Sequence, residues 1–160
     1  MLDDATVQAA AQALYDAEKN RQQIAPLTLS HPTMDMDDAY RVQRAWVDRK
    51  IADGDSISGY KIGLTSRAMQ LAMSIDTPDF GILLQSMYYP NNATIRCADF
   101  LDPRIEVELG FVMKKRLFGA DVTIEDVLDA TDYIVPSLEL IAARSFRTDP
   151  ETGYTRKVYD

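Results

Sequence analysis

The stretch Arg-Ile-Glu-Val-Glu-Leu-Gly-Phe, residues 104–111, defines the fold better than any other part of the sequence. Apolar and polar positions alternate along it, which is the period of a β-strand. The side chains of Glu106 and Glu108 therefore lie on one strand face, with about 6.6 Å between their Cα atoms. The stretch predicts a strand with one apolar face and one acidic face.

The acidic face has two interpretations. A strand with apolar residues inward and glutamates outward is an ordinary half-solvated strand. Alternatively, a hard cation such as Mg²⁺ or Mn²⁺ relieves the repulsion between two close carboxylates, because it prefers oxygen ligands. Gly110 is next on the acidic face and favours the second interpretation, since a glycine within a strand often marks the close approach of a ligand or another backbone.

A second long strand is predicted from Tyr133 to Ile141. Most of this segment is apolar, so we expect it to be buried on both faces. Glu139 is the exception, and a buried carboxylate is costly unless it is paired, protonated or bound to a metal. Glu139 is therefore the candidate third ligand of a metal site that begins with Glu106 and Glu108.

Length and composition limit the class of protein. The chain has 160 residues, of which 46% are apolar and 26% charged, and this is typical of one globular domain with its own core. The net charge of −8 argues against a nucleic-acid binder. No apolar run is long enough to span a bilayer, and the N-terminus has no signal-peptide pattern. We therefore expect a cytoplasmic enzyme or binding protein without a membrane partner.

Cysteine and histidine chemistry is nearly excluded. Cys97 is the only cysteine, so the chain has neither an intrachain disulfide nor a cysteine–histidine zinc pattern. His31 is the only histidine, and a Ser-His-Asp system would depend on it alone. Its neighbours Ser30 and Pro32 predict a solvated loop.

Capping residues and apolar spacing predict four helices. Gly54 follows the second helix as a C-terminal cap glycine would, and Trp46 on its apolar stripe is expected in the core. The third helix ends near Met73 and the fourth near Ala130. Residues 76–81 are predicted as a turn-rich loop before a short apolar strand. The predicted N-terminal caps are, in chain order, Asp3, Asp35 or Asp37, Thr65 or Ser66, and Thr123.

A further strand is predicted from Ser56 to Leu64, with Lys61 between Gly59 and Gly63 on one face. A lysine between two residues without side chains has open space beside it, and that space could admit a ligand. Alternatively, this is a solvated edge strand whose lysine discourages pairing with another chain.

Four segments have the order and spacing of a known family: Gly59–Ser66 (GYKIGLTS), Pro78–Gly81 (PDFG), Arg104–Glu108 (RIEVE) and Leu138–Ile141 (LELI). Together they resemble the 2-keto-4-pentenoate hydratase group of the fumarylacetoacetate hydrolase superfamily. The likeness covers nearly the whole chain, including its ending at residues 149–160. Each segment alone is a weak motif, and their combination makes the resemblance specific.

The resemblance implies an α+β fold. An N-terminal helical segment, residues 1–55, would precede the first part of a metal-binding mixed β-sheet roll of the fumarylacetoacetate-hydrolase C-terminal-domain type, residues 56–160, in one structural unit. Ala142 stands where the family has an aspartate, which removes support behind the metal ligands. Family members continue well past the position of Asp160, so we expect a fold that is incomplete at the C-terminus and has little or no activity alone.

The resemblance also implies an activity. The members that the chain resembles most hydrate 2-oxohept-4-ene-1,7-dioate, a small 2-oxo dicarboxylic acid, to 4-hydroxy-2-oxoheptanedioate in the homoprotocatechuate branch of aromatic catabolism, and a homo-oligomer is expected. Glu106, Glu108 and Glu139 would hold Mg²⁺ or Mn²⁺, which would polarise the 2-oxygen of the substrate. Lys61 and Asp79 would carry the two proton events, which are protonation of the dienol and addition of water.

Three other functions stay open. A metal-dependent decarboxylase of the 4-oxalocrotonate type shares the carboxylate arrangement but releases CO₂. A C–C hydrolase is less favoured, because such enzymes use a histidine-assisted water and His31 is far from the metal motifs in sequence. A non-catalytic partner subunit is the third alternative, for which Ala142 and the expected incomplete fold would be tolerable.

Overall fold

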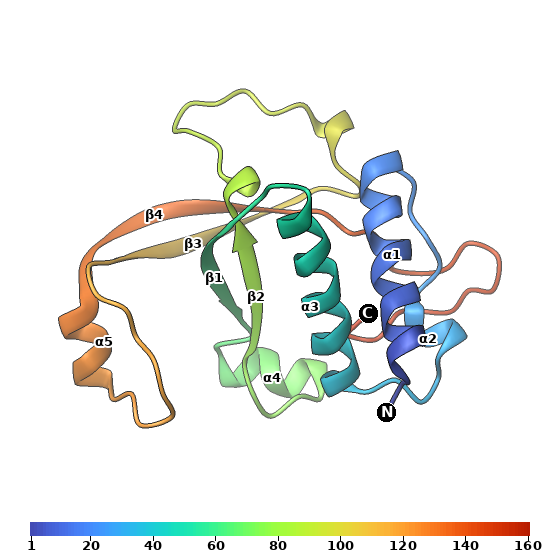
Figure 1. The fold of residues 1–160 in the computed structure, drawn as a ribbon, viewed down its shortest axis with the longest axis horizontal. Helices are drawn as coiled ribbons and strands as arrows, with labels where there is room; N and C mark the ends of the chain where they lie inside the picture. Colours follow the sequence, from blue (N-terminus) through green and yellow to red (C-terminus); the bar gives the residue numbers. More distant parts are fainter. The chain divides into compact units, whose positions relative to one another are not determined.

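The computed structural model describes residues 1–160, whose contacts divide the chain into two compact units (Figure 1). The first unit contains Met1–Leu101 together with Ala143–Asp160, and the second contains Asp102–Ala142. The boundary expected after residue 55 separates two segments of the sequence, whereas these units are defined by their contacts. The expected boundary therefore stays a prediction.

Four α-helices belong to the first unit, and the predicted caps of three are in place. Asp3, Asp35 and Ser66 each accept a hydrogen bond from a backbone N–H in the first turn of the helix that follows. These N–H groups have no partner within the helix, so each cap stabilises its helix start. The sequence did not predict α2, which is a single turn. The helices are α1 (Asp4–Asn20), α2 (Leu27–Ser30), α3 (Met36–Ala52) and α4 (Arg67–Met73).

The core of the first unit lies between α1 and α3, which pack against each other (Figure 1). Both helices place small or apolar side chains on one stripe, so their backbones approach closely. Trp46 is 6% exposed, which confirms its predicted place in the core. The buried cluster consists of Val7, Ala10, Ala11, Leu27, Met34, Val42, Ala45, Trp46, Val47 and Leu84.

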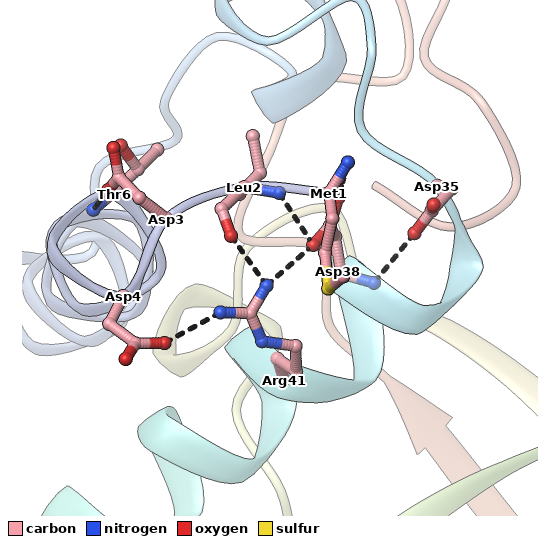
Figure 2. Close-up of polar contacts among 8 residues, drawn as sticks. All are labelled: Met1, Leu2, Asp3, Asp4, Thr6, Asp35, Asp38 and Arg41. Atoms are coloured by element: carbon pink, nitrogen blue, oxygen red, sulfur yellow. Dashed lines mark hydrogen bonds and ion pairs between the residues drawn. The ribbon is translucent and has the colours of Figure 1, made fainter.

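A polar network ties the start of α1 to the first turns of α3 (Figure 2). The fully buried carboxylate of Asp38 accepts hydrogen bonds from the Leu2 N–H at 2.9 Å and from Arg41 Nη1 at 2.8 Å. Arg41 also donates to the Leu2 carbonyl and to Asp4, both at 2.7 Å. Burial raises the pKa of Asp38, but the hydrogen bonds from Leu2 and Arg41 and the ammonium group of Met1 lower it overall.

The segment 143–160 returns to the helices of the first unit. Arg144 Nε donates a hydrogen bond to Glu18 of α1 at 2.8 Å, and Lys50 of α3 donates to the other oxygen of the same carboxylate. The Arg144 guanidinium also lies over the ring of Trp46, 4.3 Å from its centroid. One carboxylate therefore joins three segments that are distant in sequence.

The first sheet pairs β1 (Ile57–Gly63) with β2 (Asp79–Leu84) in antiparallel register. In β2, the ring of Phe80 stacks on the ring of Tyr40 of α3, with ring centroids 4.4 Å apart. Leu84, at the end of β2, is fully buried in the core. The loop predicted for residues 76–81 was therefore wrong in its second half, because pairing with β1 extends β2 back to Asp79. Two 3₁₀ helices follow, η1 (Gln85–Met87) and η2 (Cys97–Asp99).

The second unit is a long two-stranded ribbon with one short helix. Strands β3 (Arg104–Met113) and β4 (Thr131–Ile141) are antiparallel, and α5 (Ile124–Ala130) precedes β4. The predicted capping box of α5 is confirmed: Thr123 accepts from the Asp126 N–H, and the Asp126 carboxylate accepts from the Thr123 N–H.

The predicted burial of β4 on both faces was wrong. Leu138 is 70% exposed, and its partner across the ribbon, Val107, is 82% exposed. Apolar side chains of both strands share this face because cross-strand partners point to the same side of a sheet. Within the second unit α5 packs mainly against β4, and the apolar face is exposed.

The α+β class is confirmed, since helices and strands share the chain. The strands form two separate antiparallel pairs, however, and not the single mixed sheet that was expected. No helix combines the length and the apolar character needed to cross a membrane.

Candidate metal centre and proton-transfer face

The strand register brings the three predicted metal ligands together. Glu106 and Glu139 are direct partners in the β3–β4 ladder, and Glu108 lies two residues further along the same face of β3, opposite Ser137. Direct cross-strand partners have Cβ atoms only about 5 Å apart. The sequence predicted that Glu106 and Glu108 share a face and that Glu139 is an exceptional acid in the second strand, and the register determines that the three carboxylates meet.

The carboxylate triad, Glu106, Glu108 and Glu139, offers one oxygen from each residue, and these oxygens lie within 4.8 Å of one another. Ligands of a Mg²⁺ ion at about 2.0–2.1 Å in octahedral geometry are separated by roughly 3 to 4 Å. Rotation of the glutamate side chains covers that difference. Three hard oxygen donors on one face therefore fit a divalent cation such as Mg²⁺ or Mn²⁺.

Gly110 has a different surrounding from the one its position suggested. A side chain at Gly110 would lie 3.2 Å from Val135 Cγ2 and 3.5 Å from Ser137 Oγ. The close approach is therefore made by the neighbouring strand. This glycine supports packing in the ribbon and gives no evidence for a ligand.

The other predicted site residues lie in the first unit, on one face of the β1–β2 pair. Lys61 is opposite Gly81, and Asp79 is opposite Gly63. The aliphatic stem of Lys61 lies over Gly81, where an added Cβ would be 2.8 Å from Lys61 Cγ. The Asp79 carboxylate lies over Gly63 so closely that a Cβ there would overlap with Oδ1. We call this the glycine face, and it comprises Gly59, Lys61, Gly63, Asp79 and Gly81.

Asp79 carries an unusual polar atom. Its Oδ1 is buried and has no hydrogen-bond partner in the protein. An unpaired buried oxygen costs roughly 1 to 3 kcal/mol, so such atoms are rare and recur at functional sites. This is an observation that a purely structural role of Asp79 does not explain.

The sequence missed one polar group of this face. Tyr88, the residue after η1, places its hydroxyl 2.9 Å from the position of a Cβ on Gly59. The space beside Lys61 was expected to be open, but Tyr88 fills it at one end and Asp79 at the other. No local pattern connects Tyr88 to Gly59, because Tyr88 lies 29 positions after Gly59 and only the fold brings them together. In the sequence, only the glycines of the glycine face indicated that another group approaches Lys61.

Similarity searches place these motifs among known proteins. No family model matches the chain. The 2-oxo-hept-4-ene-1,7-dioate hydratase of Escherichia coli is 49% identical over 160 residues, which is 100% of this chain and 60% of that protein. A 2-keto-4-pentenoate hydratase of Paraburkholderia xenovorans is 41% identical over 84% of this chain and 50% of that protein. By sequence, the whole of this chain is similar to part of the 2-keto-4-pentenoate hydratases. The predicted resemblance is thus confirmed.

A solved structure has a similar fold. The 4-oxalocrotonate decarboxylase of Pseudomonas putida G7, complexed with magnesium and adipate, superposes with a TM-score of 0.86 at 35% identity, over 98% of this chain and 62% of that one. The same decarboxylase is also known in complex with calcium and acetate. The chain therefore spans about half to three fifths of the length of these relatives.

Proposed function

We propose that this chain is the metal-binding and proton-transferring part of a divalent-metal-dependent hydratase that acts on 2-hydroxy-2,4-dienoates and their 2-oxo-4-enoate forms. The carboxylate triad is the observation that carries the proposal, because three glutamates from two strands converge within 4.8 Å. Similar proteins are hydratases by name, and a similar structure was solved with magnesium. The activity, the substrate and the homo-oligomeric state of the whole enzyme are part of the proposal, and so is the cytoplasmic location.

Glu106, Glu108 and Glu139 would hold Mg²⁺ or Mn²⁺. When bound, the metal would accept the carboxylate and 2-oxygen of a 2-oxo acid and stabilise the enolate charge. The three glutamates repel one another without a cation, which favours loading of the site. Ala142, directly after β4, contributes no carboxylate to support them.

Lys61 and Asp79 would transfer protons. Lys61 carries three N–H donors and suits a developing oxyanion or a proton relay. Asp79 Oδ1 has no hydrogen-bond partner in the protein. That atom can therefore accept or deliver a proton without first breaking a hydrogen bond. In the reaction, one proton moves to a carbon of the dienol, and water then adds its hydroxyl and its hydrogen across the remaining double bond.

The finer substrate follows from the similarity. The seven-carbon diacid 2-oxohept-4-ene-1,7-dioate is proposed because the hydratase named for it is 49% identical to this chain. Decarboxylation of a 4-oxalocrotonate-type substrate is the second candidate, and the 35% identity and the fold shared with the decarboxylase favour it. Incubation with each substrate, with CO₂ release measured beside formation of the hydrated product, separates the two.

Metal titration calorimetry tests the triad. We expect Glu108→Gln to weaken Mg²⁺ or Mn²⁺ binding by at least about ten-fold, since a charged ligand is lost. Glu125→Gln on α5 removes the same charge outside the triad and is the control, for which no change is expected. Equal affinity of Glu108→Gln and the unaltered chain would remove the metal site from the proposal.

Asp79→Asn tests the proton-transfer assignment. Turnover should be lost, because the amide cannot exchange a proton, while metal affinity by calorimetry should stay within about two-fold. If metal affinity disappears instead, Asp79 serves the metal site and the assignment is wrong.

A further inference from the structure

We propose that Tyr88 is a third functional residue of the glycine face and that its hydroxyl holds the water molecule that is added to the substrate. This role rests on the proposed hydratase function. No feature of the sequence assigns a role to Tyr88, and the inference comes from three contacts.

Each glycine of this face makes room for one polar side chain. The Tyr88 hydroxyl lies over Gly59, the stem of Lys61 lies over Gly81, and the Asp79 carboxylate lies over Gly63. A Cβ at any of these glycines would be within 2.9 Å of the group above it, closer than real Cβ contacts. Three such coincidences on one face are more than packing requires.

The three groups form a row along β1. Gly59, Lys61 and Gly63 follow one another at intervals of two residues on one face. The Cα atom of Lys61 is therefore about 6.6 Å from the Cα atom of each glycine. Tyr88 and Asp79 therefore flank Lys61 on opposite sides. A row of this kind can contact successive atoms of an extended acid chain.

The Tyr88 hydroxyl has the chemistry to hold a water. It makes no hydrogen bond within the protein, and the side chain is 52% exposed, so a ligand can reach it. A phenol both donates and accepts a hydrogen bond, whereas an ammonium group only donates and a carboxylate only accepts. Among the three groups, Tyr88 is thus the one that can both donate a hydrogen bond to a water and accept one from it, which leaves proton transfer to Lys61 and Asp79.

The test separates water addition from proton transfer. Hydration of 2-hydroxypenta-2,4-dienoate requires both, whereas deuterium exchange at C3 of the saturated acid 2-oxopentanoate in D₂O requires only proton transfer. In the intact hydratase that contains this chain, with Mg²⁺, we expect Tyr88→Phe to lower kcat for hydration by about ten-fold, the value of one hydrogen bond. Exchange, followed by NMR, should stay within two-fold.

The neighbouring Tyr89 supplies a matched control. It is also 52% exposed, and its ring contacts Phe100 edge to face. Tyr89→Phe should leave hydration and exchange unchanged. If Tyr88→Phe lowers both reactions equally, Tyr88 only supports the face, and if it lowers neither, the residue has no role; both results overturn the inference. An intact enzyme without any substitution that does not hydrate the dienoate overturns the proposed function, and this role falls with it.

Discussion

Single residues determine where the polar groups of β1 and β2 lie. Gly63 is the sharpest case, because a Cβ there would overlap with Asp79 Oδ1 and the missing side chain leaves room for that carboxylate. Gly63 has an ordinary negative φ, so the reason for a glycine here is space and not backbone conformation. The location of Asp79 thus depends on a residue that has no chemistry of its own.

Gly63→Ala should therefore disturb the proton-transfer step. The added methyl group must displace the carboxylate, so we expect exchange and hydration to fall by about ten-fold or more while metal affinity is retained. A double-mutant cycle with Asp79→Ala supplies the control, because Gly63→Ala should cost little once the carboxylate is absent. Additive effects in the cycle would show that Gly63 acts independently of Asp79.

Sequence patterns identified the three glutamates but missed Tyr88. The glutamates are marked by patterns within short segments, whereas Tyr88 is marked only by a contact between distant segments. Alternation within ten residues placed Glu106 and Glu108 on one face, and an acid within an apolar run marked Glu139. The meeting of the three depends on register, which alternation alone does not give. Tyr88 contacts Gly59 across a strand pair and a 3₁₀ turn, so no short window contains the information.

Whole elements show the same limit. Caps determine helix starts locally, and the observed caps Asp3, Asp35, Ser66 and Thr123 are all among the one or two candidates that the sequence offered for each helix. The extent of β2 and the exposure of β4 were not, because a strand's length and burial depend on what pairs with it and covers it. The structure extends β2 to include Asp79 and leaves β4 as half of a two-stranded ribbon.

At this scale, Glu18 determines how α1, α3 and the returning segment are held together. Burial raises the pKa of the Glu18 carboxyl, but Arg144 and Lys50 outweigh it and lower the pKa overall. We expect Glu18→Gln to reduce the free energy of unfolding by about 1 to 2 kcal/mol, since two cations lose their partner. Asp48→Asn is the control, because Asp48 forms only an exposed pair with Arg44 at 3.3 Å. Equal losses in urea titrations would contradict this role of Glu18.

The pH dependence follows from the same carboxylates. Glu18 and Asp38 both have lowered pKa values in the folded chain, so the unfolded chain binds protons first as the pH falls. Their stabilisation is complete above about pH 5 and is lost progressively as the pH falls through the ordinary carboxyl range near 4 and below it. The unfolding midpoint in urea should decrease over that window, and Glu18→Gln should reduce the slope. A midpoint independent of pH from 5 to 3 would contradict the assignment.

On the scale of the whole molecule, the core and the metal centre belong to different units. The buried cluster lies entirely in the first unit, whereas the carboxylate triad and the exposed apolar face lie on the β3–β4 ribbon. A two-stranded ribbon is marginally stable in water by itself. A cation bound to the carboxylate triad would join the two strands, so the stability of the ribbon should increase when the metal is bound.

Hydrogen exchange followed by mass spectrometry tests this division. Without metal, amides of β3 and β4 should exchange faster than those of α1 and α3, because local opening costs less where fewer apolar side chains are buried. Added Mg²⁺ should slow exchange in β3 and β4 and leave α1 and α3 unchanged, since a ligand stabilises only the part that binds it. In Glu108→Gln this protection should be lost, whereas Glu125→Gln should keep it. If Mg²⁺ protects α1 and α3 as much as the ribbon, the chain unfolds as one cooperative unit and the metal does not act through the ribbon alone.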